Sequence, residues 1–166
     1  MQQVVQEIKN LSIGFTSKKG EQISILKNIS TTINKGETVG IVGESGSGKS
    51  TLALAMMGYV KHGLFTISGE CIYQSNDILK MKNRELENIR GRKIAMIPQN
   101  AGQSLTPNLK IGYQIDEALR LHTNFQKEDR DVKISELLNK VRLPSPETIA
   151  KRYPHELSGG QQQGVA

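Results

Sequence analysis

The sequence predicts an α/β fold in which short apolar strands are followed by a predominantly helical second half. Two observations carry this prediction. An apolar run at residues 38–42 leads directly into a loop with three glycines, and the apolar run at residues 52–57 after that loop is typical of a helix. Beyond Pro107, apolar residues recur at helical spacing instead of in short runs. At 166 residues the chain has the size of one domain.

The apolar runs in the first hundred residues predict the strands. We expect strands at residues 5–15, 23–33, 38–42, 65–73 and 93–98. The Asn and Gly residues at 34–37 and the Gly at 61–63 predict turns between them.

Helices are expected after the glycine-rich loop, from Lys49, and again beyond Pro107. One predicted apolar face comprises Ile111, Ile115, Ala118, Leu119 and His122. A second comprises Ile134, Leu137, Leu138 and Val141. The prolines that interrupt the chain after these helices are Pro144, Pro146 and Pro154.

The glycine-rich loop matches the pattern G-x-x-x-x-G-K-[ST] of a phosphate-binding loop. It comprises Gly43, Glu44, Ser45, Gly46, Ser47, Gly48, Lys49, Ser50 and Thr51. Its glycines allow successive N–H groups to turn inward, and the following helix N-terminus favours a bound anion. Lys49 is expected to contact the β- and γ-phosphates, and the Ser50 hydroxyl to ligate Mg²⁺. The alternative is a chance Gly/Ser-rich turn, which the strand–loop–helix context disfavours.

A second motif, near the end of the chain, narrows the class of protein. It comprises Leu157, Ser158, Gly159, Gly160 and Gln161, and it resembles the signature sequence of ABC-type ATPases. Ser158 is a good helix N-cap, and the two glycines leave the helix N-terminus accessible to an anion. The resemblance implies that this segment contacts the γ-phosphate of ATP held by the phosphate loop of a second subunit.

Two further residues are assigned by the same resemblance. Gln99, after the apolar run at 93–98, resembles the Q-loop glutamine, which reaches Mg²⁺ or the attacking water and couples nucleotide state to the membrane partner. Phe15 occupies the place of the family's aromatic residue that stacks on adenine. The alternative for Phe15 is a strand aromatic packed in the core.

The resemblance covers essentially the whole chain and implies a P-loop NTPase fold, the ABC nucleotide-binding domain. Its expected parts are an N-terminal antiparallel β subdomain, a helical subdomain and an incomplete parallel sheet. On this basis residues 1–100 form the nucleotide-binding core with the β subdomain, 101–157 the helical subdomain, and 158–166 the signature motif and the start of its helix. The runs that resemble ATPase subunits of dipeptide, oligopeptide and nickel importers are residues 69–73, 77–79, 89–97 and 104–107.

The function implied is the ATP-binding subunit of an ABC importer for peptides or nickel chelates, with ATP and Mg²⁺ as ligands. The implied partners are a second ATP-binding subunit, transmembrane permease subunits and, indirectly, an extracytoplasmic substrate-binding protein. The implied location is the cytoplasmic face of the membrane.

The resemblance also implies acidic residues that this sequence lacks. In the family, a Walker B Asp helps to hold Mg²⁺ and the adjacent Glu polarises the attacking water; neither has a counterpart here. The chain is therefore expected to be a C-terminally truncated fragment, and Gln99 is its only candidate for contact with the water. Whether it hydrolyses ATP stays open. Two alternatives are a catalytically silent remnant that only binds nucleotide, and a non-transport ABC ATPase acting on DNA or ribosomes.

Composition limits the remaining possibilities. The net charge is +6, but only 4% of residues are aromatic and they do not interleave with the basic ones, so no nucleic-acid partner is expected. The three histidines, His62, His122 and His155, lack metal-ligand spacing. Cys71 is expected to be a small buried hydrophobe. No run approaches the ~20 apolar residues of a membrane span, so membrane association is expected through a partner.

Overall fold

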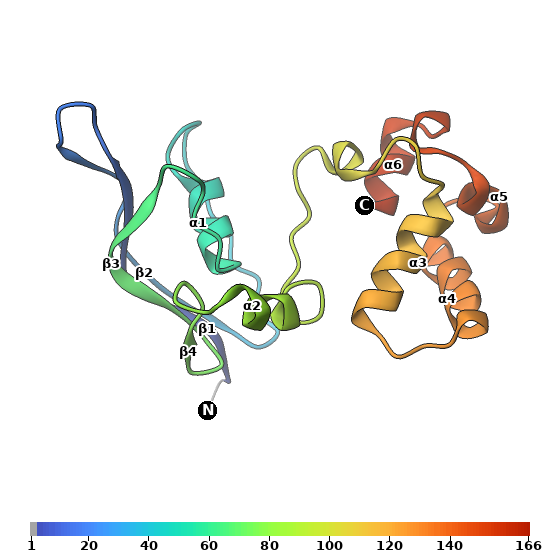
Figure 1. The fold of residues 1–166 in the computed structure, drawn as a ribbon, viewed down its shortest axis with the longest axis horizontal. Coiled ribbons are helices and arrows are strands. Elements are labelled where there is room, and N and C mark those ends of the chain that lie inside the picture. The colour runs from blue at the N-terminus through green and yellow to red at the C-terminus, as the bar shows by residue number, and fades with distance from the viewer. Residues whose placement is uncertain (1–2) are drawn as a thin grey trace. The chain divides into compact units, whose positions relative to one another are not determined.

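A four-stranded antiparallel sheet organises the first part of the chain in the computed structural model, which describes residues 3–166 (Figure 1). Its strands are β1 (Val4–Thr16), β2 (Gln22–Asn34), β3 (Phe65–Tyr73) and β4 (Asn76–Asp77), in the order β2-β1-β3-β4. The long β1 is central to the pairing, since it lies between β2 and β3. The strands predicted at 5–15, 23–33 and 65–73 are thereby confirmed, whereas β4 was not predicted.

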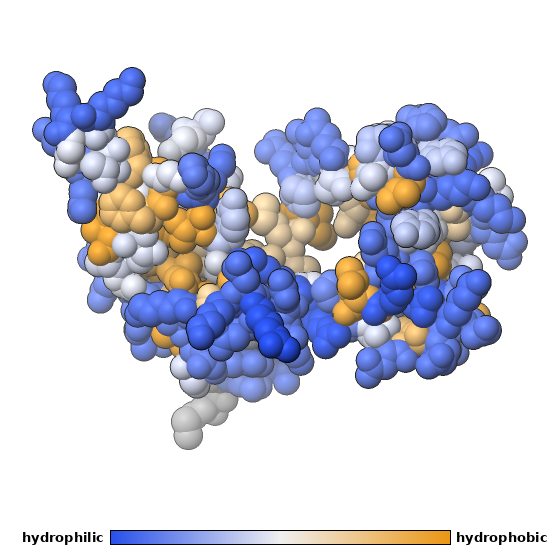
Figure 2. All heavy atoms as spheres, viewed as in Figure 1, coloured by the Kyte–Doolittle hydropathy of each residue, from blue (hydrophilic) through white to orange (hydrophobic). Residues whose placement is uncertain are grey.

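Two helices belong to the same unit, α1 (Lys49–Met56) and α2 (Asn83–Ile89). The helix expected from Lys49 is confirmed, and α2 was not predicted. In Figure 2, orange atoms gather where the sheet lies, and blue atoms cover the segment around α2. The buried core of this unit comprises Ile8, Leu11, Ile13, Leu26, Leu52, Ala55, Cys71, Tyr73, Ile78 and Leu86.

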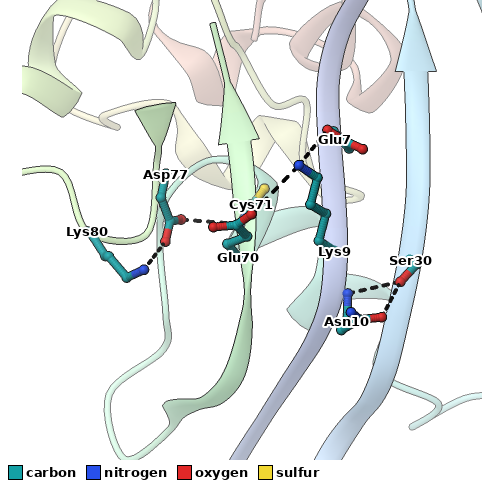
Figure 3. Close-up of polar contacts among 8 residues, drawn as sticks. All are labelled: Glu7, Lys9, Asn10, Ser30, Glu70, Cys71, Asp77 and Lys80. Carbon is teal, nitrogen blue, oxygen red and sulfur yellow. Dashed lines mark hydrogen bonds and ion pairs between the residues drawn. The ribbon is translucent and has the colours of Figure 1, made fainter. Parts of the chain in front are cut away.

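Cys71 lies in this core with no exposed surface, as predicted. Burial raises the pKa of its thiol to about 11, although a hydrogen bond from Gln6 acts in the opposite direction. The thiolate is the reactive form, so Cys71 is inert at neutral pH. Its backbone N–H donates to Asp77 Oδ1 at 3.2 Å (Figure 3), which ties β3 to β4.

The sheet unit also carries exposed ion pairs. Lys9 on β1 lies 3.1 Å from a Glu7 carboxylate oxygen, and Lys80 Nζ lies 2.9 Å from Asp77 Oδ2 (Figure 3). Hydrogen bonding to Glu7 raises the pKa of Lys9, and hydrogen bonding to Asp77 raises that of Lys80. Both lysine side chains are well exposed, so water screens these pairs and the sheet depends on its buried face.

The second unit, Ala95–Ala166, is helical. Its helices are α3 (Ile111–His122), α4 (Lys127–Lys140), α5 (Pro146–Lys151) and α6 (Gly159–Val165), with 3₁₀ turns at Ala101–Ser104 and Pro154–Glu156. Its buried core comprises Ile111, Ile134, Leu138, Leu143, Ile149 and Leu157. Both apolar faces predicted after Pro107 therefore lie on helices. Two of their members are nevertheless exposed: Ala118, and Val141, which is the C-cap residue just after α4.

Two predicted strands are wrong. Residues 38–42 and 93–98 form no strand, and Ile94 makes only an isolated bridge to Arg90. A strand requires a neighbour that pairs with its backbone N–H and C=O groups, and within the described residues neither segment has one. Their side chains are accordingly exposed, Val42 to 96% and Ile97 to 73%.

No helix in the described part of the chain combines the length and the apolar character needed to cross a bilayer.

Candidate functional site

The glycine-rich loop turns directly into α1, with Gly48 as the N-cap residue of the helix. Gly46 and Gly48 have φ angles of 84° and 93°, in the left-handed region that favours glycine. A Cβ at Gly48 would also come within 2.7 Å of Leu26 Cδ2 on β2. Glycine is therefore required at position 48 both by the backbone angle and by the close approach of the sheet.

The Lys49 side chain folds back over the loop that precedes it. Its ammonium donates to the carbonyl oxygens of Gly43 at 2.8 Å and Glu44 at 2.6 Å, and to Ser47 Oγ at 3.3 Å. These contacts hold a positive charge over the loop, at the N-terminal end of α1. The loop residues are thus brought together as the motif predicts.

The N-terminus of α1 has no side chain that neutralises it. Gly48 provides no capping side chain, and the first turn of α1 contains no acidic residue. The N–H groups at a helix start have no intrahelical partner and carry the positive end of the helix dipole. Since residues 43–47 and Ser50 are exposed, an anion can reach these groups from solvent. The arrangement is chemically suited to bind phosphate.

Phe15 lies near the end of β1, half-buried and outside the set of buried core residues. It pairs with Ile23 of β2, and Ile25 and Leu26 of the same strand are the residues that Gly48 approaches. At about 3.3 Å per residue along a strand, Phe15 is within roughly 10 Å of the point where the loop meets the sheet. Its role in stacking on a base stays a prediction.

Phe15→Ala is expected to weaken binding of ATP by roughly 1–3 kcal/mol, the range for base–aromatic stacking, and to leave binding of inorganic triphosphate unchanged. Calorimetric titration with both ligands measures this difference. Phe125→Ala, which removes an exposed phenylalanine from the other unit, is the control. An equal loss for ATP and triphosphate would instead assign Phe15 to core packing.

The motif at residues 157–161 forms the start of α6. Ser158 is its N-cap, as predicted: Ser158 Oγ accepts a hydrogen bond from the backbone N–H of Gln161 at 3.3 Å, and Gln161 Oε1 accepts one from the Ser158 N–H at 2.9 Å. Leu157 is buried and anchors the segment, whereas Gly159 and Gly160 are exposed. A Cβ on either glycine would meet no atom within 4 Å. The glycines therefore present an open surface.

Gln162 supports this motif in a way that the sequence did not reveal. Its Nε2 donates to the carbonyl oxygens of Pro154 at 2.8 Å and Leu157 at 3.1 Å, which fixes the turn before the motif. Gly164 lies within α6 without ending it, although glycine in a helix costs about 1 kcal/mol relative to alanine.

Gln99 is exposed and precedes the 3₁₀ turn at Ala101–Ser104 in the second unit. The phosphate-binding loop lies in the first unit. The structure brings the loop residues together and the residues of the α6 motif together, each within its own unit. The contacts predicted for Gln99 and for the α6 motif with bound nucleotide stay predictions.

The same chain resembles known proteins along nearly its whole length. A family model described as "ABC transporter" matches residues 26–166. The chain is 39% identical over 166 residues to the oligopeptide transport ATP-binding protein OppD of Bacillus subtilis, covering 96% of this chain and 44% of that protein. It is 38% identical over 164 residues to the glutathione import ATP-binding protein GsiA of Escherichia coli K12, covering 95% of this chain and 26% of that protein.

The fold has a counterpart among solved structures. A dimeric ATP-binding cassette in a post-hydrolysis state, bound to ADP and phosphate, superposes with a TM-score of 0.82 at 30% sequence identity, covering 96% of this chain and 66% of that one. The chain spans less than half the length of the two curated relatives.

Proposed function

The chain belongs to the ABC transporter family, and on that premise we propose that it binds ATP as part of the ATP-binding subunit of a peptide importer. The fold class expected from the sequence, that of the ABC nucleotide-binding domain, is confirmed. The observation that carries the proposal is the Lys49 ammonium, fixed over the loop by the Gly43 and Glu44 carbonyls at the start of α1.

In this proposal the phosphates of ATP lie against the backbone N–H groups of the loop and of the first turn of α1. Lys49 turns its ammonium from the loop carbonyls to the β- and γ-phosphate oxygens, which are stronger acceptors because they are charged. Phe15 supports the adenine from the end of β1.

The protein offers Mg²⁺ few ligands at this loop, so the ion fits there only when phosphate oxygens bind it as well. Ser50 offers one exposed hydroxyl oxygen, and no group of three or more His, Cys, Asp or Glu residues in the described part of the chain could hold a metal. Mg²⁺ commonly takes few protein ligands and completes its shell with phosphate oxygens and water. When bound, it would neutralise charge on the phosphates. Ser50 and Gln99 are the residues proposed to contact it.

The segment at residues 157–161 is proposed to act on a second subunit. The open N-terminus of α6 at Gly159 and Gly160 is available for the γ-phosphate of a nucleotide on the partner, and dimerisation would follow ATP binding. The solved dimeric cassette supports this proposal.

The proposed partners beyond the dimer are permease subunits in the membrane, with a substrate-binding protein acting through them, and the proposed location is the cytoplasmic face of the membrane. Peptide is the favoured substrate because the named relatives transport oligopeptides and glutathione. Nickel chelates are the second candidate, from the sequence resemblance alone.

Gly160→Asp in the intact protein is expected to abolish ATP-dependent dimerisation and to reduce cellular uptake of a labelled oligopeptide at least about tenfold. The introduced carboxylate would have room within its own chain, so its effect would come from charge repulsion of the partner's γ-phosphate. ATP binding by the monomer should not change. Gly160→Asn is the neutral control of similar shape, and should retain more uptake. Unchanged peptide uptake in the Gly160→Asp variant would contradict the proposal, and a parallel assay with labelled nickel would separate the two substrates.

A further inference from the structure

The C-terminal end of α1, the end of the helix away from the phosphate-binding loop, is closely packed against neighbouring segments. Gly58, two residues after the helix, has a φ of 71°, and its N–H donates to the Ala55 carbonyl at 2.9 Å. A Cβ at Gly58 would come within 2.9 Å of the Ile78 carbonyl oxygen and 2.7 Å of Leu86 Cδ2. The helix end therefore lies directly against the segments that contain Ile78 and Leu86.

Two side chains from different elements bind three consecutive carbonyls at this end. Gln6 on β1 donates through Nε2 to the Met56 carbonyl at 2.7 Å. Arg90, which follows α2, donates through Nε to Met57 O and through Nη2 to Gly58 O, both at 2.9 Å. Carbonyls at the end of a helix and just after it have no intrahelical partner, and a planar guanidinium can bind two carbonyls at once. Gln6 is only 7% exposed, and the same Nε2 also donates to Cys71 Sγ at 3.3 Å, so its amide lies within the core.

The position of α1 determines the position of the loop. Eight residues of helix span about 12 Å, and the loop is continuous with the first of them. The segment that precedes the loop, residues 38–42, does not pair with any strand in the described residues. Apart from the close approach of Gly48 to Leu26, the sheet therefore constrains the loop through α1, which buries Leu52 and Ala55 against the core and is fixed at its far end by Gln6 and Arg90.

We propose that Gln6 and Arg90 are positioning residues for the phosphate-binding loop, acting through α1. The inference rests on the proposed function, because it takes the loop to be the nucleotide site. If α1 shifts or rotates, the N–H groups and the Lys49 ammonium move together away from the phosphate oxygens. A small misplacement of binding groups is enough to cost large factors in affinity or rate.

The test uses the intact protein with variants that alter only the end of α1. Arg90→Lys keeps the positive charge but provides a single point donor in place of the two-bond guanidinium, and Gln6→Met keeps the length but removes the donor. Each is expected to lower the affinity for an ATP analogue and for inorganic triphosphate by the same factor, about tenfold. Arg84→Lys is the matched control, because Arg84 is an exposed residue of α2, and its affinity should stay within twofold of the parent.

A second measurement separates positioning from a general loss of stability. In the folded variants, the backbone amide NMR shifts of residues 46–51 should move, whereas those of the β1–β2 turn, residues 17–21, should not. A cap that only stabilised the protein would reduce the folded fraction without moving native signals. Unchanged loop shifts and unchanged affinities in both variants would overturn the inference.

The NMR measurement needs no nucleotide, so it tests the positioning role of Gln6 and Arg90 independently of ATP binding. A parent protein that does not bind ATP contradicts the proposed function. Loop signals that still respond to Arg90→Lys would support the coupling of α1 to the loop in that case.

Discussion

Lys49→Ala is expected to weaken binding of a non-hydrolysable ATP analogue by roughly 10- to 150-fold, because a hydrogen bond to a charged group contributes about 1.5–3 kcal/mol. In the folded chain the Lys49 ammonium is already held over the loop by the Gly43 and Glu44 carbonyls. Little side-chain entropy is therefore lost when it contacts phosphate. The loop lies exposed, so both carbonyls regain water when the lysine is removed, and the variant should remain folded.

Isothermal titration of the analogue, with the melting temperature recorded for each variant, measures this effect. Lys35→Ala is the matched control, since it removes the same charge from an exposed turn of the same unit. Equal affinities for the parent and Lys49→Ala would show that the loop does not bind phosphate, and would remove the basis of the proposed function. A loss shared by Lys35→Ala would point to net charge instead of to the loop.

The features that were predictable from the sequence are those encoded by adjacent residues. The loop and the start of α1 follow from Gly43 to Ser50, because the glycines, the lysine and the helix start are contiguous. The cap of α6 follows likewise from Ser158 and Gln161, three residues apart. Strands β1, β2 and β3 were predictable because apolar residues mark a sheet with one buried face.

The missed contacts at the end of α1 depend on residues far apart in the chain. Gln6 and Met56 are separated by 50 positions, and Arg90 and Met57 by 33. Nothing in the neighbourhood of Gln6 or Arg90 distinguishes a side chain that caps a helix from an exposed one. The strands expected at 38–42 and 93–98 fail for a related reason: apolar composition indicates a preference for extended backbone, whereas pairing requires a partner strand that local sequence does not specify.

The polypeptide of residues 1–166, expressed by itself, is expected to melt broadly with low cooperativity, to associate, and to release no phosphate from ATP above a Lys49→Ala control. Its two units have separate cores. Each also exposes an apolar segment whose backbone pairs with no strand in the described residues, including Val42 at 96% and Ile97 at 73% exposure. Unpaired extended segments of this kind favour association between chains. The acidic residues that the family uses for Mg²⁺ and for the attacking water have no counterpart in this sequence.

Calorimetry, light scattering and a phosphate-release assay test this expectation, and two matched variants locate its cause. Val42→Thr combined with Ile97→Thr should increase the monomeric fraction without lowering stability, because both side chains are exposed. Ile13→Thr makes the same kind of change at a fully buried position, where an unpaired hydroxyl is costly, and should unfold the first unit. Two results together would contradict the expectation. The first is a sharp two-state transition in which the calorimetric and van't Hoff enthalpies agree, and the second is phosphate release that Lys49→Ala abolishes. The segments at 38–42 and 95–98 would then have to be paired in solution, and a group within residues 1–166 would have to supply the missing carboxylate chemistry.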